Sequence, residues 1–174
     1  DLPVMDDDDF RRGKPTCHKL YGDALALLAG DALLTHAFSV LAKNSQISGI
    51  CPYAVIDVIK KISLAAGGAG MIGGQVVDIA SSGEHIDRDT LLYIGNHKTG
   101  CLISAALWSG ARLASASKQD LKSIKYYGEK IGLAFQIVDD ILDIKGEEKI
   151  VGKPIGSDAK NKRNTFIDLL GYDN

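Results

Sequence analysis

The sequence predicts an all-α fold, and the placement of its apolar residues supports this class. Several long segments carry apolar residues at a spacing of about 3.6 residues, and strict apolar–polar alternation, which marks a half-buried strand, is scarce. The 19 glycines are the one compositional objection. A glycine inside a helix costs about 1 kcal/mol relative to alanine. Close helix–helix approach or a bound ligand would explain those at Gly30, Gly73, Gly74, Gly110 and Gly132.

The helices are expected in six segments. The first, 23–43, is rich in alanine and leucine and ends at Asn44 and Ser45. Pro52 suits the first turn of a second helix, which runs to about residue 66 and ends at Gly67 and Gly68. The remaining helices are expected at 71–81, 87–113, 119–145 and 164–170.

Length and composition limit the function classes. The 174 residues are enough for one compact domain, and the abrupt start and end suggest a domain truncated on both sides. A net charge of −2 gives no reason to expect nucleic acid as a partner. No apolar run approaches the ~18 to 20 residues of a membrane span, and no secretory leader is visible. Three widely spaced cysteines favour a reduced, cytoplasmic protein over a disulfide framework or a zinc site.

An acidic cluster on the segment 119–145 is the first candidate for chemistry. Four polar residues project within an arc of ~100° on one helix face, and three isoleucines fall on another. The four are Gln136, Asp139, Asp140 and Asp143. Asp139 and Asp143 lie one turn apart, where like charges destabilise a helix unless a cation lies nearby. A solvated acidic face is the plain alternative, but the flanking residues are too apolar for it, which favours a site lining a cavity.

A second acidic cluster lies at the other end of the chain. Asp6 to Asp9 are followed closely by Arg11 and Arg12. Carboxylates are the ligands that Mg²⁺ prefers, and Mg²⁺ usually bridges them to substrate phosphates, which arginine also binds. By itself, this run is more typical of a self-neutralising surface loop. Both clusters together predict a metal-dependent enzyme of diphosphates, with Lys153 and Lys162 as further phosphate ligands.

Five segments together resemble the trans-isoprenyl diphosphate synthases. Residues 1–16 resemble the first aspartate-rich motif of this family, and residues 132–143 resemble the second. The segments 70–78, 97–100 and 152–158, the last with Thr165 and Phe166, are similar to further family signatures in the family's order. The resemblance covers the whole chain and is strongest to the short-chain bacterial farnesyl or geranylgeranyl type. It implies one polyprenyl synthetase domain over residues 1–174, built as an isoprenoid synthase helical bundle around a central cavity.

The resemblance also assigns roles to residues. Metal ligands are expected at Asp1, Asp6, Asp139 and Asp143. They would hold Mg²⁺, with three ions per active site, and Mn²⁺ could take its place. Diphosphates are expected to bind Arg11 (allylic), Arg12 (isopentenyl), Lys98, Lys153 and Arg163, with Lys162 as the alternative to Arg163. The positions beside the reacting carbons are Thr99, Phe135 and Gln136. Asp6, Lys98, Gln136, Asp139 and Asp143 are expected to be catalytic, while Gln75 and Asp78 either support the metal shell or are structural.

The implied reaction joins isopentenyl diphosphate to dimethylallyl or geranyl diphosphate and gives farnesyl diphosphate or a similar short-chain product. Metal-assisted ionisation gives an allylic cation, which the isopentenyl double bond attacks. Alternatives are a geranylgeranyl diphosphate synthase, a terpene cyclase or head-to-head synthase, and a non-catalytic regulatory subunit. The arginine pair indicates two diphosphate substrates, which argues against a cyclase, and the retained aspartates argue against a non-catalytic subunit.

A homodimer is also expected. The segment 87–113 carries apolar and small residues on more than one face, so it should be buried on several sides. The resemblance implies a homodimer packed through helices, and we expect a C2 dimer with a largely apolar interface that buries at least ~2,000 Å² in total.

Overall fold

The computed structural model describes residues 1–146, 156, 159 and 163–170, and the all-α prediction is confirmed there. The long helices are α2 (Asp23–Lys43), α3 (Pro52–Ala66), α4 (Met71–Ala80), α6 (Cys101–Leu113) and α7 (Lys118–Lys145). The shorter helical elements are α1 (Cys17–Tyr21), η1 (Asn44–Gln46), α5 (Arg88–Ile94), η2 (Gly95–Gly100) and α10 (Phe166–Leu170). Apart from the segment 87–113, each long helix begins and ends within a few residues of the predicted positions.

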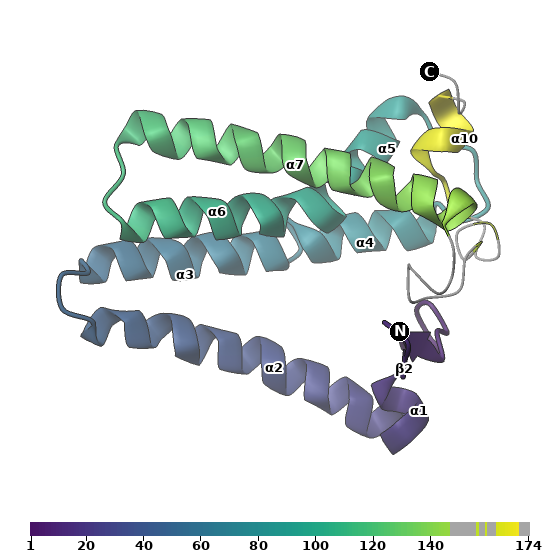
Figure 1. Ribbon diagram of the computed structural model, residues 1–174, viewed down its shortest axis with the longest axis horizontal. Coiled ribbons are helices and arrows are strands. Elements are labelled where there is room, and N and C mark those ends of the chain that lie inside the picture. Colours follow the sequence, from purple (N-terminus) through teal and green to yellow (C-terminus); the bar gives the residue numbers. More distant parts are fainter. Residues whose placement is uncertain (147–155, 157–158, 160–162, 171–174) are drawn as a thin grey trace.

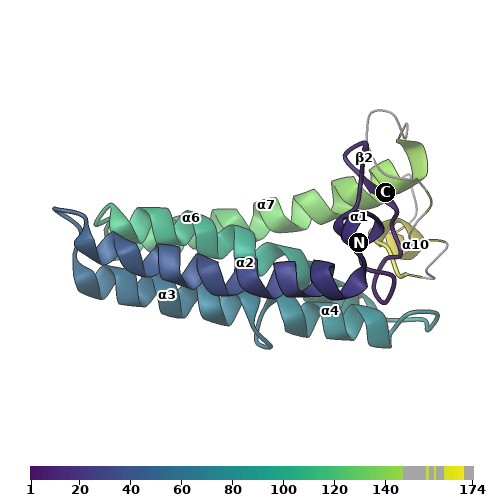
Figure 2. The same ribbon diagram turned by 90° about the horizontal axis from the view of Figure 1, so that it is seen from below.

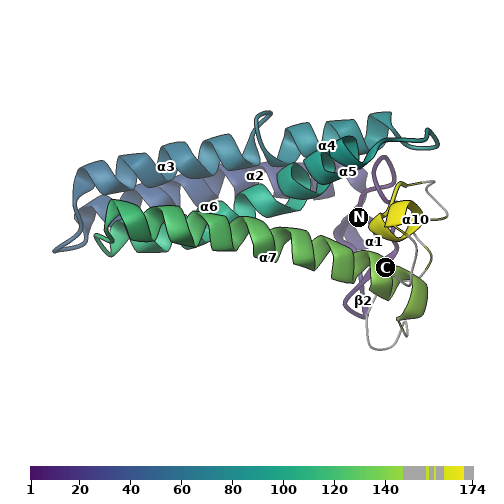
Figure 3. The same cartoon turned by 90° about the horizontal axis from the view of Figure 1, so that it is seen from above.

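The helices form an elongated bundle, and the N-terminal loop, α1, α5 and α10 lie at one end of it (Figure 1). α6 packs against α7 on one side and α3 on the other, and α4 continues roughly in line with α3. α10 packs against the C-terminal end of α7, whereas α1 and β2 lie at the same end of the bundle on the side of α2 (Figure 1), and Figures 2 and 3 show this end from below and from above. Residues far apart in sequence therefore meet at this end of the bundle.

Local sequence explains where the main helices begin. α3 begins with Pro52, whose fixed φ suits the first helical turn and whose missing N–H would have no partner there. α5 begins after Asp87, whose carboxylate accepts a 2.8 Å hydrogen bond from the Thr90 backbone N–H. α7 begins after Ser117, whose hydroxyl accepts from the Asp120 N–H at 3.1 Å.

The segment 87–113, predicted as one helix, is divided by a π-helical insertion. α5 ends at Ile94, η2 follows from Gly95 to Gly100, and α6 begins at Cys101. A π-helical turn adds a residue to the ordinary turn, so the side chains on either side of it change face. The apolar residues that seemed to cover several faces of one helix therefore belong to two helices in different register.

The expected homodimer stays a prediction. α6 packs between α3 and α7, which covers part of its surface, while its large apolar side chains are half-buried and Ala106 is exposed. Large apolar side chains are exposed on α3, α4 and α7 and also on α2, which has no buried residue. Its large exposed side chains include Leu25, Leu27, Leu28, Leu33, Leu34 and Val40.

α2 also bears on the expectation of no membrane span. The stretch Asp23–Gln46 is long and apolar enough to cross a membrane by length and composition, because a few charged residues do not outweigh its leucines and alanines. The core helix of a soluble protein can pass the same test. The absence of a membrane span therefore stays a prediction.

The loop expected before α2 contains a short hairpin and a helical turn. β1 (Phe10–Arg11) pairs with β2 (Lys14–Pro15) in antiparallel register, Phe10 opposite Pro15 and Arg11 opposite Lys14. Arg12 and Gly13 form the turn with φ of 53° and 71°. Positive φ at both turn residues matches the right-handed twist of a two-residue hairpin. Arg-Gly is an unusual pair for such a turn, which explains why the pattern suggested a plain loop.

Candidate functional site

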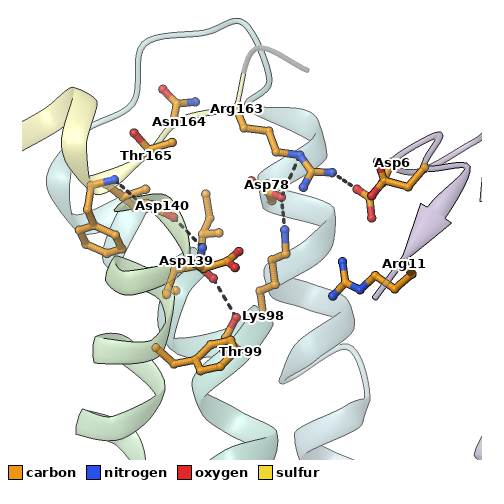
Figure 4. Close-up of a pocket in the computed structure, with 17 residues that line it drawn as sticks. Asp6, Arg11, Asp78, Lys98, Thr99, Asp139, Asp140, Arg163, Asn164 and Thr165 are labelled. Atoms are coloured by element: carbon orange, nitrogen blue, oxygen red, sulfur yellow. Dashed lines mark hydrogen bonds and ion pairs between the residues drawn. The ribbon is translucent and has the colours of Figure 1, made fainter. Parts of the chain in front are cut away.

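A polar cavity of about 200 Å³ lies at this end of the bundle, lined by the N-terminal loop, η2, α7 and the segment 163–166 (Figure 4). Asp6 and Asp8 reach it from the N-terminal loop, and Asp139 and Asp140 reach it from α7. The cations that line it are Arg11, Lys98 and Arg163. The structure thus brings the two acidic clusters to one cavity together with basic side chains, as a site for a metal ion and a diphosphate requires.

The N-terminal acidic loop is held by Thr16. The Thr16 hydroxyl, buried at the end of the hairpin, donates to the backbone oxygen of Asp8 at 2.9 Å. The Thr16 N–H donates to the backbone oxygen of Asp9 at 2.9 Å, and His18 Nδ1 lies 3.1 Å from the Thr16 hydroxyl. His18 therefore acts as a buried hydrogen-bonding partner in this loop.

The two arginines after the first cluster lie in different places. Arg11 is on β1 and lines the cavity, whereas Arg12 occupies the exposed turn of the hairpin and does not line it. Adjacent strand residues point to opposite faces, and the positive φ of Arg12 turns the chain further. The position of Arg11 agrees with its predicted role. Arg12 lies outside this cavity, and its binding of isopentenyl diphosphate stays a prediction.

Two of the cations are bound to carboxylates. Lys98 Nζ lies 2.7 Å from Asp78 Oδ2, and Arg163 Nη2 forms an ion pair with Asp6. Arg163 Nε also lies 4.0 Å from the same Asp78 oxygen. Burial alone would raise the pKa of Asp6, but the charge and hydrogen bond of Arg163 outweigh it and hold the pKa below the ordinary 3.8. Asp78, which is 6% exposed, thus lies between two of the predicted phosphate ligands.

Lys98 and Thr99 face the cavity because of the π-helical insertion. Gly95, Lys98 and Thr99 line it, while Asn96 and His97 line a separate groove on the other side of η2. The His97 ring stacks on Tyr93 at a centroid distance of 3.8 Å, away from the cavity. Insertions of this kind often occur at functional sites, because they turn chosen side chains toward a ligand.

Asp140 is buried and bonded to protein groups on both oxygens. Gln136 Nε2 donates to Asp140 Oδ1 at 2.8 Å, and the Phe166 backbone N–H donates to Oδ2 at 2.8 Å. Gln136 in turn accepts a 3.0 Å hydrogen bond from the Thr99 hydroxyl. Burial raises the pKa of Asp140 above 3.8, although the bonds from Phe166 and Gln136 oppose this shift.

The predicted metal ligands are only partly brought together. Asp6 and Asp139 share the cavity, whereas Asp1 does not line it and Asp143 lines a neighbouring one with Ile144 and Asp168. No group of three His, Cys, Asp or Glu side chains within residues 1–146, 156, 159 and 163–170 is arranged to hold a metal ion. The donor set still fits Mg²⁺, which binds one or two carboxylates and completes its shell with water and substrate phosphates.

A strap from Arg163 to α10 closes one side of the cavity and was largely missed by sequence reasoning. Asn164 Nδ2 donates to the backbone oxygen of Ser81 at 3.0 Å, and the Thr165 hydroxyl donates to Asp168 at 2.7 Å. Phe166 is 4% exposed and packs on Gly95, where an added Cβ would meet its ring at 3.4 Å. The resemblance had included Thr165 and Phe166 without a role, and Lys153 and Lys162 lie outside the described residues.

Comparison with known proteins assigns the chain to a family. A model of the polyprenyl synthetase family matches residues 3–174. The chain belongs to the polyprenyl synthetase family. Membership agrees with the resemblance of the motifs.

Several members of this family are similar over nearly the whole chain. The chain is 44% identical over 174 residues to the geranylgeranyl diphosphate synthase of Cyanophora paradoxa, covering 99% of the chain and 57% of that protein. It is 45% identical to the farnesyl diphosphate synthase of Escherichia coli K12, covering 99% of the chain and 58% of that protein. The chain spans somewhat more than half the length of these relatives.

Solved structures give the same result. The geranyltransferase of Helicobacter pylori, complexed with magnesium and isoprenyl diphosphate, superimposes with a TM-score of 0.88 at 34% identity. The match covers 99% of this chain and 55% of that one. An FPP/GFPP synthase from Zymomonas mobilis matches with a TM-score of 0.84 at 37% identity, covering 99% and 57%. The isoprenoid synthase helical fold is thus confirmed for the part of the chain that the structure describes.

Proposed function

We propose that the full-length protein is a Mg²⁺-dependent prenyltransferase that joins isopentenyl diphosphate to an allylic diphosphate. The observation that carries this proposal is the meeting of both acidic clusters with Arg11, Lys98 and Arg163 in one cavity. The curated relatives named farnesyl and geranylgeranyl diphosphate synthase support the same chemistry. Relatives of both kinds are similarly identical to the chain, so farnesyl diphosphate is the proposed product and geranylgeranyl diphosphate the alternative.

The carboxylates proposed to hold Mg²⁺ are Asp6 and Asp139, with Asp1 and Asp143 as further ligands. Bound Mg²⁺ would neutralise the charge that develops on the leaving diphosphate. The magnesium in the H. pylori geranyltransferase structure supports the choice of ion, and three ions per site with Mn²⁺ as a substitute remain part of the proposal.

The chain's own side chains then hold the allylic diphosphate and shape the reacting centre. Lys98 and Arg163 exchange carboxylate partners for phosphate oxygens when the substrate enters, and Arg11, Lys153 and Arg12 add further positive charge. Thr99 and Gln136 lie beside the carbon from which the diphosphate departs. Phe135, on the cavity wall, lies beside the isopentenyl group and helps to exclude water from the cation.

We further propose a cytoplasmic homodimer with α2 in its interface. All three cysteines are free thiols, which agrees with a reducing compartment. The leucines of α2 are exposed on several sides of the helix and supply apolar surface of the kind that obligate interfaces bury. Sedimentation of the full-length protein at micromolar concentration tests this state, and a fully active monomer would contradict it.

Incubation with labelled isopentenyl diphosphate separates the candidate functions. We expect the full-length protein to incorporate the label only when Mg²⁺ and dimethylallyl or geranyl diphosphate are also present. A cyclase would release diphosphate from the allylic substrate alone, and a non-catalytic subunit would do neither. Mass spectrometry of the product then distinguishes farnesyl from geranylgeranyl diphosphate. Absence of any incorporated label would overturn the proposed condensation.

A further inference from the structure

Asp140 differs from the other carboxylates of the cavity because neutral donors occupy both its oxygens. One oxygen accepts from the Gln136 amide and the other from the Phe166 backbone N–H, each at 2.8 Å. The side chain is 3% exposed, whereas Asp6 is 34% exposed and ion-paired with Arg163. Asp140 is therefore built into the wall of the cavity.

The hydrogen bonds from Asp140 to Thr99 have a direction that the carboxylate fixes. An ionised carboxylate only accepts, so Gln136 must turn its NH₂ group toward Asp140 and its oxygen toward Thr99. That oxygen then accepts the Thr99 hydroxyl proton at 3.0 Å. The Thr99 oxygen is left with lone pairs to offer to the cavity that both side chains line.

We propose that Asp140 is a positioning residue that orients the Gln136 amide and, through it, the Thr99 hydroxyl. With this orientation, Thr99 presents oxygen lone pairs, and not a proton, to the allylic carbon that becomes positive. A fixed dipole aimed at developing charge stabilises the transition state more than the ground state. The proposal rests on the proposed prenyltransferase function and adds a role for a carboxylate that is not assigned to the metal.

The same carboxylate holds the strap that begins at Arg163. The Phe166 N–H bond and the packing of the Phe166 ring on Gly95 attach α10 to α7 and η2. A structural role at the strap is the main competing explanation for any effect of replacing Asp140. The test must therefore separate orientation of Gln136 from attachment of the strap.

Asp140→Asn makes this separation. The asparagine oxygen can still accept from the Phe166 N–H, so the asparagine NH₂ group must face Gln136. The Gln136 amide must then rotate by about 180°, with its oxygen toward residue 140 and its NH₂ group toward Thr99. Gln136 then donates to Thr99, and the hydroxyl proton is released toward the cavity. Adding Gln136→Glu restores the original direction, because the introduced carboxylate accepts from both neighbours and the total charge of the pair is unchanged.

In the full-length protein, Asp140→Asn should lower kcat about 10- to 100-fold with nearly unchanged KM values. Gln136→Glu alone places two carboxylates in contact and should also lower kcat. The kcat of the double variant should be at least about tenfold higher than that of Asp140→Asn. Two independent sites would not show this recovery, because their effects on kcat would add. Glu129→Gln, which removes a half-buried carboxylate paired with Lys125 on the same helix and away from the cavity, is the matched control and should keep wild-type kcat.

Hydrogen exchange of the peptide 163–170 supplies a readout besides turnover. We expect its protection to persist in Asp140→Asn and to be lost in Asp140→Ala, and the Mg²⁺ concentration for half-maximal rate to stay unchanged in Asp140→Asn. Additive kcat losses in the double variant, loss of protection in Asp140→Asn, or a raised Mg²⁺ requirement would each overturn the proposal. A wild-type protein that does not condense the two diphosphates would instead refute the proposed function itself.

Discussion

Gly74→Ala tests whether close backbone approach between α4 and η2 sets the geometry of the cavity. A Cβ added at Gly74 would lie 2.2 Å from the Lys98 backbone nitrogen and 2.8 Å from Lys98 Cα. Ordinary contact begins near 3.4 Å, so the two elements must separate by about 1.2 Å. The obstacle is backbone, which cannot rotate out of the way as a side chain can.

This displacement should also change the distance between Lys98 and Asp78, which lies one turn after Gly74 on α4. Asp78 lies on the same helix as Gly74 and holds Lys98 Nζ at 2.7 Å. A shift of about 1 Å takes that contact beyond hydrogen-bond distance. Misplacement of a substrate-binding group by about 1 Å can cost 10²-fold in rate. We therefore expect Gly74→Ala to lower kcat/KM about 10²-fold.

Stability should change in the same variant. Alanine gains about 0.5–1 kcal/mol of helix propensity over glycine, but overpacking costs about 1–3 kcal/mol. We expect a net loss of about 1–2 kcal/mol in the free energy of unfolding, measured by urea denaturation. Gly110→Ala is the matched control, because nothing lies within 4 Å of an added Cβ there, and it should be neutral or stabilising. Equal stability and activity of the two variants would refute the close-approach explanation.

Three further predictions follow from single contacts. Ser117→Ala removes the cap of α7 and should lower the free energy of unfolding by about 1 kcal/mol without changing kcat, as urea denaturation and a steady-state assay would show. Arg11→Ala should raise KM for the allylic diphosphate more than for isopentenyl diphosphate, and Arg12→Ala should do the reverse; equal effects would contradict separate sites. The hydrogen bonds of Thr90 lower the pKa of Asp87, so its stabilising cap is present above pH 3.8 and is lost as pH falls through the lowered value. An NMR titration of the Thr90 amide should follow that loss, and a midpoint above 3.8 would contradict it.

The long helices could be predicted because their apolar spacing and end signals lie within each segment. Pro52 and the glycines after residue 66 mark the bounds of α3 without any tertiary information. The division of 87–113 could not be predicted in this way. A π-helical turn is selected by packing, as where Gly74 admits the Lys98 backbone, and that contact lies outside the segment.

The site, like the fold, could be predicted only where the signal lies within a local segment of sequence. The two acidic clusters and Lys98 could be identified from motifs, and the structure brings Asp6, Lys98 and Asp139 to one cavity. The partners of these residues depend on tertiary structure, as the pairing of Asp6 with Arg163 across 157 positions shows. The Asp140 bond to the Phe166 backbone has no side-chain signal at residue 166, so the strap could not be inferred from residue types.

Calorimetric titration of Mg²⁺ into the full-length protein tests the metal site most directly. The titration is made with a thio analogue of the allylic diphosphate that cannot ionise, for the wild type, Asp6→Asn and Asp139→Asn. Because Asp6 and Asp139 approach the cavity from opposite ends of the chain, we expect each substitution to abolish metal-dependent binding of the analogue or to weaken it at least about tenfold. Wild-type affinity and stoichiometry in either variant would contradict a metal site shared by the two acidic clusters.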